Sequence, residues 1–528
     1  MASPGQNKLR RGLTSRHLSM ISIGGVIGVG MFLGSAATVK LAGPAVILSF
    51  ALGGVIMMMV MLALAEMSVA EPVEGSFRTY AAESLHPYAG YVVGWTYCVA
   101  WVVIMSAEIV AASTYMRLWV SPELALAFGL IFAVAMTLVN LASVRSFGEF
   151  EFWFAMIKVV AIVAFIIIGG AAILGIGPFA PIGLRNYVGH GGFAPRGVAG
   201  VLLAMVMVMV AYGGTEVVGV AAAETENPAT SVPRAVNGVA LRTVVLYIGS
   251  MTVLVGTIPW FQVGLGASPF VRVYQLLRIP AAANIMNFVV ITAALSSMNS
   301  GLYTSSRMLY SLAEAGAAPR LFTRLGRRSR VPYLAVVGST FFLYVGVILY
   351  YLVPKTAFLY ITGIGGFGFL FSWLIISLSQ IYMRRRILAR DPAALKFRMP
   401  GYPYTSWMTV LLIVGVIVTL PFVPGQRVGF VSGLVWLAVV SLYWLVSCKR
   451  RFAPRLITRR RPLGLEFASF MGLPHERDVR GRLAAVRDGV PTHGAAGNAV
   501  TGEDATRDAV TGSDPGNAAG GVSGRSDG

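Results

Sequence analysis

Long apolar runs alternate with short polar segments along most of this chain of 528 residues. A helix needs about 20 apolar residues to cross a bilayer, and run after run reaches that length. The runs are apolar on every face rather than along one stripe, so they predict helices buried in lipid and against one another. We expect about twelve spans, at about residues 21–38, 45–69, 88–118, 123–142, 150–176, 197–222, 240–260, 281–311, 333–353, 357–383, 405–423 and 428–448.

Polar segments flank the predicted membrane domain, which covers residues 17–450. Residues 1–16 form a basic lead, and no short apolar core with a cleavage site follows it, so we expect it to stay in the cytoplasm. Residues 451–528 form a cytoplasmic tail that is basic at first. From about residue 475 the tail is rich in Gly, Ala, Asp and Thr without apolar periodicity, which predicts disorder.

The composition agrees with an all-α integral membrane protein. Hydrophobic residues make up 56% of the chain and charged residues 12%, which excludes an ordinary soluble globular protein. The net charge of +20 would also fit a nucleic-acid-binding protein. The basic residues, however, fall mainly on the loops that would be cytoplasmic, which is the positive-inside pattern of membrane proteins. We therefore expect a multi-pass protein of the cell membrane with both termini in the cytoplasm and no nucleic acid partner.

The chain lacks the residue spacing of an enzyme or a metal site. Its two cysteines, Cys98 and Cys448, are far apart, and its five histidines are scattered. We find no nucleophile–base pair, and no phosphate-binding loop between a strand and a helix. We therefore expect no enzymatic activity, no metal and no cofactor. Basic clusters such as Arg384–Arg386 are expected to contact anionic headgroups, which makes membrane lipids predicted partners.

The first predicted span contains five glycines within eleven residues, from Gly24 to Gly34. Glycine weakens a helix, and unwound backbone at membrane depth is tolerated only where it is buried in protein or lines a cavity. One explanation is therefore a functional interruption of the helix. The other is close packing between helices, because Gly24 and Gly28, like Gly30 and Gly34, are four residues apart.

A second glycine cluster, at Ala211, Tyr212, Gly213 and Gly214, interrupts the sixth predicted span. Interrupted helices at matching positions in two halves of a chain indicate the binding site of a transporter built from inverted repeats. This correspondence favours the functional explanation of the first cluster.

Two interrupted helices side by side suit a zwitterion. Amides at the start of a half-helix attract an anion, and carbonyls at the end of a half-helix attract a cation. We therefore expect the carboxylate of an amino acid to bind the amides near Gly28, Val29 and Gly30. Its amino group would bind carbonyls near Ile27 and near Ala211–Gly213.

Several motifs occur in a fixed order: Gly25-Val-Ile-Gly28-Val-Gly30, Leu41-Ala-Gly43-Pro44, Gly148-Glu-Phe150-Glu-Phe152-Trp, Ile157-Lys158-Val and Ala222-Ala-Glu224-Thr-Glu226-Asn-Pro228. Together they resemble the amino acid permeases of the amino acid–polyamine–organocation (APC) superfamily, over about residues 15–450. The resemblance implies 12 transmembrane helices in a leucine-transporter-like fold, with two inverted five-helix repeats plus two helices. It also implies proton-coupled uptake by alternating access. The family's first motif usually has Ser or Thr where this chain has Val29, which keeps the backbone amide but offers no hydroxyl.

Charged residues inside the apolar spans are the next candidates. Lys158 costs at least about 2.5 kcal/mol to insert, so it should face protein and have a partner. In related transporters the corresponding lysine replaces a sodium ion beside the first helix, so the resemblance implies a proton-coupling role. The alternative is a lysine that only braces first-helix carbonyls. Glu216 follows the second glycine cluster and is expected either to belong to the gate or proton path, or to brace the interruption.

Tyr97, Trp101, Met105 and Glu108 lie at helical spacing on one side of the third span. If that side lines the cavity, Trp101 and Met105 would contact the substrate, and Glu108 would hold the distal amine of a cationic or ω-amino substrate. The alternative for Glu108 is a carboxyl that is satisfied within the bundle or protonated.

Two further residues are expected at the site. Tyr212 would pack over the substrate, with core packing as the alternative. Ser297 in the eighth span would supply a polar contact, although serines in membrane helices often bond only to their own backbone.

The sequence thus predicts a secondary active amino acid importer that uses the proton as its coupling ion. Two alternatives remain. One is an amino acid exchanger of the same fold, and the other is a non-transporting amino acid sensor that signals through its basic loops or its tail.

Overall fold

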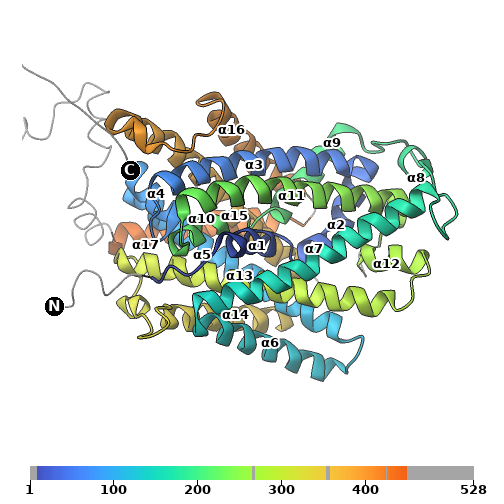
Figure 1. Cartoon of the computed structure of the whole chain (residues 1–528), viewed down its shortest axis with the longest axis horizontal. Helices are drawn as coiled ribbons and strands as arrows, with labels where there is room; N and C mark the ends of the chain where they lie inside the picture. The colour runs from blue at the N-terminus through green and yellow to red at the C-terminus, as the bar shows by residue number, and fades with distance from the viewer. Residues whose placement is uncertain (1–8, 265–267, 353–356, 424, 449–528) are drawn as a thin grey trace, which may run out of the picture. The chain divides into compact units, whose positions relative to one another are not determined.

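The computed structural model describes residues 9–264, 268–352, 357–423 and 425–448 (Figure 1). These residues form helices joined by loops, with one isolated parallel β-bridge between Leu13 and Thr225. The predicted tail at residues 451–528 lies outside the described residues, as do residues 1–8 of the predicted lead.

The α-helices in chain order are α1 (Ser15–Val26), α2 (Val29–Ala42), α3 (Val46–Ala70), α4 (Ser76–Ser84), α5 (Pro87–Met116), α6 (Pro122–Ala142), α7 (Val144–Leu174), α8 (Arg185–Val188), α9 (Gly197–Ala211), α10 (Val217–Ala221), α11 (Pro228–Thr257), α12 (Pro269–Leu276), α13 (Ala282–Glu314), α14 (Tyr333–Leu352), α15 (Ala357–Arg390), α16 (Tyr404–Thr419) and α17 (Arg427–Tyr443).

Every predicted apolar run coincides with one helix or with a pair of helices. In the described part of the chain, nine helices are long and apolar enough to cross a membrane. One of the nine, Val29–Ala70, joins α2 to α3 through a short 3-10 turn. Gly197–Ala211 and Tyr333–Val345 are shorter apolar helices. Over its described residues the chain is therefore an all-helical, multi-pass membrane protein, and the count of twelve spans stays a prediction because length and composition select nine helices among those residues.

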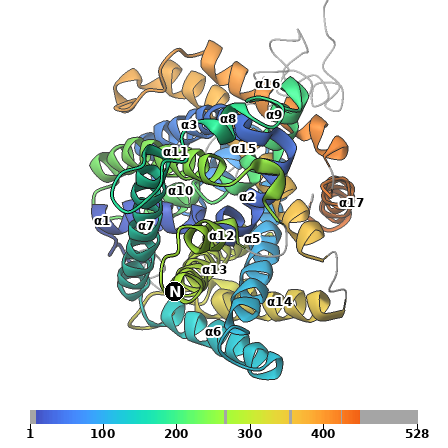
Figure 2. The same ribbon diagram turned by 90° about the vertical axis from the view of Figure 1, so that its right-hand side faces the viewer.

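The distribution of buried residues separates central helices from peripheral ones. In the most apolar stretch of α13, 83% of the residues are buried, against 28% for α16 and 22% for α17. The end-on view shows α16 and α17 at the periphery (Figure 2). Leu411 on α16 is 71% exposed, and Leu442 on α17 is 63% exposed. Exposed apolar side chains of this kind suit contact with lipid tails rather than water.

Besides α11, which starts at Pro228 rather than at residue 240, two helices begin earlier than the apolar pattern predicts. The predicted first span starts at residue 21, but α1 starts at Ser15 because the Thr14 hydroxyl caps it and accepts from the amide of His17. The predicted fifth span starts at residue 150, but α7 starts at Val144 because Ser143 caps it in the same way. A polar first turn outside the apolar run is invisible to hydropathy, so the prediction missed both starts.

The two short helices α1 and α10 pack against each other and against α11 and α13. Figure 1 shows α1 and α10 side by side among the longer helices. Beyond α1 the chain continues into α2, which packs against α9, the helix that precedes α10. This arrangement brings the two predicted interruptions, after α1 and after α9, to one place.

Candidate functional site

The first interruption separates α1 from α2. Ile27 (φ −84°, ψ 81°) and Gly28 (φ −101°, ψ −163°) leave the helical conformation, and α2 begins at Val29. Groups at helix ends lack partners within the helix. The interruption therefore presents carbonyls from the end of α1 next to amides from the start of α2.

The second interruption separates α9 from α10 and lies against the first. Between them, Gly214 has a φ of 101°, a left-handed conformation that glycine adopts without strain. A Cβ atom at Gly214 would lie 2.5 Å from the carbonyl oxygen of Gly25. The two interruptions therefore meet backbone to backbone, with no room for a side chain between them.

Tyr247 on α11 ties the two interruptions together. Its hydroxyl lies 3.2 Å from the carbonyl oxygen of Val26 and 3.0 Å from that of Ala211. The sequence does not point to Tyr247, because a tyrosine inside an apolar run carries no signal of which helices it will meet. Tyr212 packs on Tyr247, and its own hydroxyl donates to the carbonyl of Phe50 at 3.0 Å.

Lys158 on α7 reaches the end of α1. Its Nζ donates to the carbonyls of Gly24 at 2.7 Å and Ile27 at 2.8 Å. A third bond, of 2.8 Å, goes to the hydroxyl of Ser296 on α13. An ammonium has three N–H donors, so these contacts use all of them. The side chain is fully buried, and it faces protein rather than lipid.

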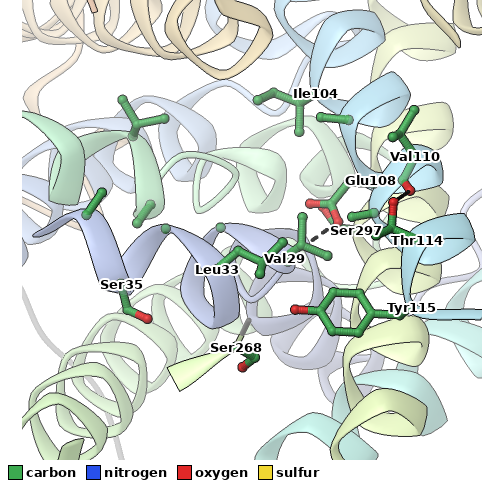
Figure 3. A pocket seen from close by; sticks show the side chains of 18 of the residues that line it. Val29, Leu33, Ser35, Ile104, Glu108, Val110, Thr114, Tyr115, Ser268 and Ser297 are labelled. Carbon is green, nitrogen blue, oxygen red and sulfur yellow. Dashed lines mark hydrogen bonds between the residues drawn. The ribbon is translucent and has the colours of Figure 1, made fainter. Parts of the chain in front are cut away.

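Glu108 on α5 reaches the start of α2. Its Oε2 accepts a hydrogen bond from the amide of Val29 at 3.2 Å, as the dashed line in Figure 3 marks. A Cβ atom at Gly28 would collide with the Glu108 carboxylate and would lie 3.0 Å from the hydroxyl of Ser297. From the sequence we expect this amide to bind a substrate carboxylate. In the structure it donates a hydrogen bond to a carboxylate of the protein itself. The positive end of a helix favours such an anion.

Both interruptions open into a cavity of about 860 Å³. Its wall also includes residues of α5, α13 and α15. The residues predicted from the sequence that line it are Gly28, Val29, Gly30, Trp101, Glu108, Ala211, Gly213 and Ser297.

The remaining predicted residues, which do not line this cavity, are Ile27, Met105, Lys158, Tyr212 and Glu216. The carbonyl of Ile27 is bonded to Lys158, on the other side of the interruption. Met105 packs against α13, where a Cβ atom at Gly301 would lie 2.6 Å from its Cγ. Helical spacing correctly places Met105 and Glu108 on one side of α5. That side extends beyond the cavity, so Glu108 lines the cavity while Met105 packs against a neighbouring helix.

The cavity wall is mostly apolar, with a few polar groups. Among the residues that line it, Glu108 is the one acidic residue and Arg117 the one basic residue. The hydroxyl of Ser35 and the side-chain oxygen of Gln426 are buried there, without a hydrogen-bond partner among the described residues. Apolar walls with a small number of polar groups are typical of sites for small ligands. Opposite charges in one cavity fit a ligand that carries both.

Glu216 holds the second interruption in place. Its carboxylate accepts from the hydroxyl of Tyr97 at 2.7 Å and from Nε1 of Trp373 at 2.9 Å. It also accepts from the amide of Gly214 at 3.1 Å. These bonds connect the interruption to α5 and α15, which is the geometry expected of a brace.

Glu151 on α7 is a buried acid that is not among the residues predicted from the sequence. Its carboxylate accepts from the hydroxyl of Ser296 and, at 2.9 Å, from Nδ2 of Asn299. A signal was available, because Glu151 lies seven residues before Lys158, on the same face of a helix. Both charged residues stand in one apolar run.

A buried ion pair closes the end of the bundle where the N-terminal segment lies. Nε of Arg307 on α13 is 2.9 Å from Oε1 of Glu224, which follows α10. The hydroxyl of Tyr303 donates to the same oxygen at 2.9 Å. The amides of Gly12 and Leu13 donate to the Glu224 carbonyl at 2.9 and 3.1 Å. The N-terminal segment is thereby held to the chain that follows the second interruption.

The known proteins that resemble this chain fall into one functional class. The model of the amino acid permease family matches residues 17–455. The gamma-aminobutyric acid permease of Bacillus subtilis (strain 168) is 41% identical over 462 residues, which cover 87% of this chain and 98% of that relative.

Two other relatives match at similar levels. The aromatic amino acid transport protein AroP of Escherichia coli (strain K12) is 38% identical, over 84% of this chain and 96% of that relative. The probable threonine/serine transporter YbxG of Bacillus subtilis (strain 168) is 38% identical, over 83% of this chain and 95% of that relative. The relatives share a class and differ in the amino acid for which they are named.

Proposed function

The chain belongs to the amino acid permease family, and from that premise we propose that it is a proton-coupled amino acid importer of the cell membrane. Its relatives are named as permeases and transporters rather than enzymes, and they support amino acid transport as its activity. The proposal includes the family's fold of twelve helices with two inverted five-helix repeats. It also includes both termini on the cytoplasmic side, in agreement with the distribution of basic residues.

One observation carries the proposal, namely that both interruptions open into the cavity that Glu108 also lines. We place the substrate carboxylate on free amides in the first turn of α2, Gly30 among them. The substrate's amino group would pair with Glu108. Without a cation between them, two carboxylates at one helix end would repel each other, so a zwitterion fits this site better than a plain acid does.

The substrate is an amino acid, and the carboxylate of Glu108 would influence which amino acid the site prefers. Relatives are named for gamma-aminobutyric acid, for aromatic amino acids and for threonine and serine. A carboxylate at the interruption would suit the α-amino group of an aromatic amino acid, threonine or serine, and it would suit the distal amine of a cationic substrate or of an ω-amino substrate such as gamma-aminobutyric acid. A competition panel of the common amino acids together with gamma-aminobutyric acid would identify the preferred class.

Lys158 would couple transport to the proton. As an ammonium it has three N–H donors, and its three acceptors are Gly24, Ile27 and Ser296. A neutral amine has two, so loss of the proton would release one acceptor. Because two of the three acceptors belong to the end of α1, the protonation state of Lys158 would control how firmly α1 is held.

Purified protein in liposomes tests the proposal. A proton importer accumulates labelled amino acid in empty liposomes when the interior is alkaline, and a protonophore abolishes the accumulation. An exchanger requires amino acid inside the liposomes and ignores the pH gradient. A sensor binds the amino acid without transporting it. Either of the last two results would refute proton-coupled import.

A further inference from the structure

Glu151 is a buried acid to which the proposed transport cycle assigns no role. Its side chain is fully buried, and it does not line the cavity. A buried acid in an apolar helix is costly, so such a residue marks a partner or a path for protons. The Glu151 carboxylate belongs to the same helix as Lys158, about two helical turns before it.

Ser296 stands between the two charged side chains. Nζ of Lys158 donates to the Ser296 hydroxyl at 2.8 Å. The same hydroxyl donates to Oε1 of Glu151. A serine hydroxyl has one donor and two acceptor lone pairs. The ammonium donates a hydrogen bond to the Ser296 oxygen, so the single hydroxyl proton of Ser296 is free to point at Glu151. The two hydrogen bonds therefore run in one direction, from Lys158 through Ser296 to Glu151.

The neighbouring groups fix the carboxylate of Glu151. Nδ2 of Asn299 donates to its Oε2 at 2.9 Å, and Nδ2 of Asn140 on α6 donates to the Asn299 side-chain oxygen at 2.7 Å. On the α1 side, Glu151 faces the backbone of Gly24, where a Cβ atom would collide with it. Asn140 and Asn299 are neutral, so the charged group next to Glu151 is Lys158.

On these contacts, and on the premise that the protein is proton-coupled through Lys158, we propose that Lys158, Ser296 and Glu151 form a proton relay. One N–H bond of Lys158 breaks as a new O–H bond forms on Ser296. The original O–H bond of Ser296 breaks as an O–H bond forms on Glu151. The products are a neutral amine, an unchanged serine and a neutral carboxylic acid, so the step conserves protons and charge.

Two consequences follow from this balance. The relay turns two buried opposite charges, bridged by Ser296, into two neutral groups, so this step leaves no isolated charge on Lys158 or Glu151. The proton leaves through the N–H that donates to Ser296, so the neutral amine keeps its bonds to Gly24 and Ile27, but these bonds lose the strength that the positive charge gives them and hold the end of α1 less firmly. Glu108, on the other side of the interruption, is the other carboxylate near Lys158, and it contacts the amide of Val29 instead of Ser296.

The experiment uses the full chain in liposomes with the variants Glu151→Gln and Ser296→Ala. Glutamine keeps the hydrogen-bond acceptor of residue 151 but accepts no proton at neutral pH. Ser296→Thr keeps the hydroxyl and serves as the conservative partner of Ser296→Ala. The matched controls are Glu123→Gln, which changes an exposed acid at the start of α6, and Ser372→Ala, which removes a buried hydroxyl bonded to its own helix.

Two activities are measured for each protein: accumulation driven by a pH gradient, and exchange between internal and external amino acid at equal pH. We expect Glu151→Gln and Ser296→Ala to lose accumulation at least about tenfold while exchange stays within about twofold. Their uptake should also depend less on external pH than that of the unchanged protein. Ser296→Thr and both controls should keep both activities.

The possible failures are distinguishable. Accumulation and a pH profile like those of the unchanged protein in Glu151→Gln and Ser296→Ala would overturn the relay. Loss of exchange together with accumulation in both variants would also overturn it, because it would assign the residues a structural role. Absence of gradient-driven accumulation in the unchanged protein would instead refute proton-coupled import itself.

Discussion

The carboxylate of Glu108 accepts a hydrogen bond from the backbone amide of Val29, with 3.2 Å between Oε2 and N. Val29 is the first residue of α2, where the helix dipole is positive and the amides lack partners within the helix. An anion of the protein therefore already lies beside the place where a substrate carboxylate is expected. The amino group of the substrate becomes the natural partner of Glu108, and the first prediction tests this pairing.

Replacing Glu108 with glutamine should weaken substrate binding. Glutamine keeps an oxygen that can accept from Val29 but has no charge for an amino group. We expect KM to rise at least about tenfold, equivalent to about 1.4 kcal/mol, and to rise more for cationic than for neutral amino acids. Initial uptake rates against substrate concentration give this value. Glu123→Gln, at the exposed start of α6, serves as the control. Equal effects on cationic and neutral substrates would contradict the selectivity role.

Adding a methyl group at Gly28 should disable the site. A Cβ atom there would collide with the Glu108 carboxylate, so Gly28→Ala would displace Glu108 from the amide of Val29. A Cβ atom at Gly170, on α7 and outside the cavity wall, would meet nothing within 4 Å. We expect uptake to fall at least about tenfold in Gly28→Ala and to change less than about twofold in Gly170→Ala. Similar losses in the two variants would show that the effect does not depend on the space at Gly28.

Replacing Lys158 with alanine should abolish accumulation driven by a pH gradient. The variant loses the ammonium that holds the carbonyls of Gly24 and Ile27, and it leaves the buried Glu151 without its cation. Leaving a buried charge without its compensating charge typically costs about 3–5 kcal/mol, so a lower thermal midpoint is also expected. Lys40→Ala, in the last turn of α2, controls for the loss of one positive charge. Accumulation at the level of the unchanged protein would remove Lys158 from the coupling mechanism.

Glu74, in the loop between α3 and α4, should make stability depend on pH. Burial, and then repulsion from Glu314, raises the pKa of Glu74 from its ordinary value of 4.5 to about 7. Because the folded protein holds this proton more tightly than the unfolded chain, the stabilisation is complete below pH 4.5 and is lost as the pH rises through about 7.

The comparison of Glu74→Gln with the unchanged protein measures this effect. Glutamine keeps an acceptor for the amide of Leu9, which donates to Glu74 at 3.2 Å, but it does not ionise. The gain in thermal midpoint of the variant should be small at pH 5 and larger at pH 8. A gain that is the same at both values would show that ionisation of Glu74 does not affect folding.

Removing Arg307 should release the N-terminal segment. The change to alanine leaves Glu224 buried without its cation, for a cost of about 3–5 kcal/mol. Because the backbone of Glu224 also binds Gly12 and Leu13, we expect faster proteolysis of the N-terminal segment together with a lower thermal midpoint. Arg320→Ala, at the exposed start of a short 3-10 helix, is the control. An unchanged rate of proteolysis would show that the ion pair and the N-terminal segment are independent.

Much of the fold could be predicted from hydropathy because a membrane helix must be apolar over its whole length. The glycine clusters also indicated both interruptions, since an unwound helix needs residues that allow it. The starts of α1 and α7 escaped prediction because Thr14 and Ser143 cap polar turns outside the apolar runs. Hydropathy reports burial in lipid, whereas capping is a local hydrogen bond, and the two need not coincide.

The sequence by itself determined that the chain is an all-helical membrane protein, that two of its helices are interrupted by glycines, and that a few charges lie inside apolar spans. Each of these properties can be read from a single segment of the sequence, without knowing what that segment packs against. The tertiary structure alone decided the partners of those charges. Glu108 meets the amide of Val29, Lys158 meets the carbonyls of Gly24 and Ile27, and Glu151 meets Ser296. The physical reason is that helical spacing fixes only the face of a residue, while the packing of neighbouring helices decides what that face touches.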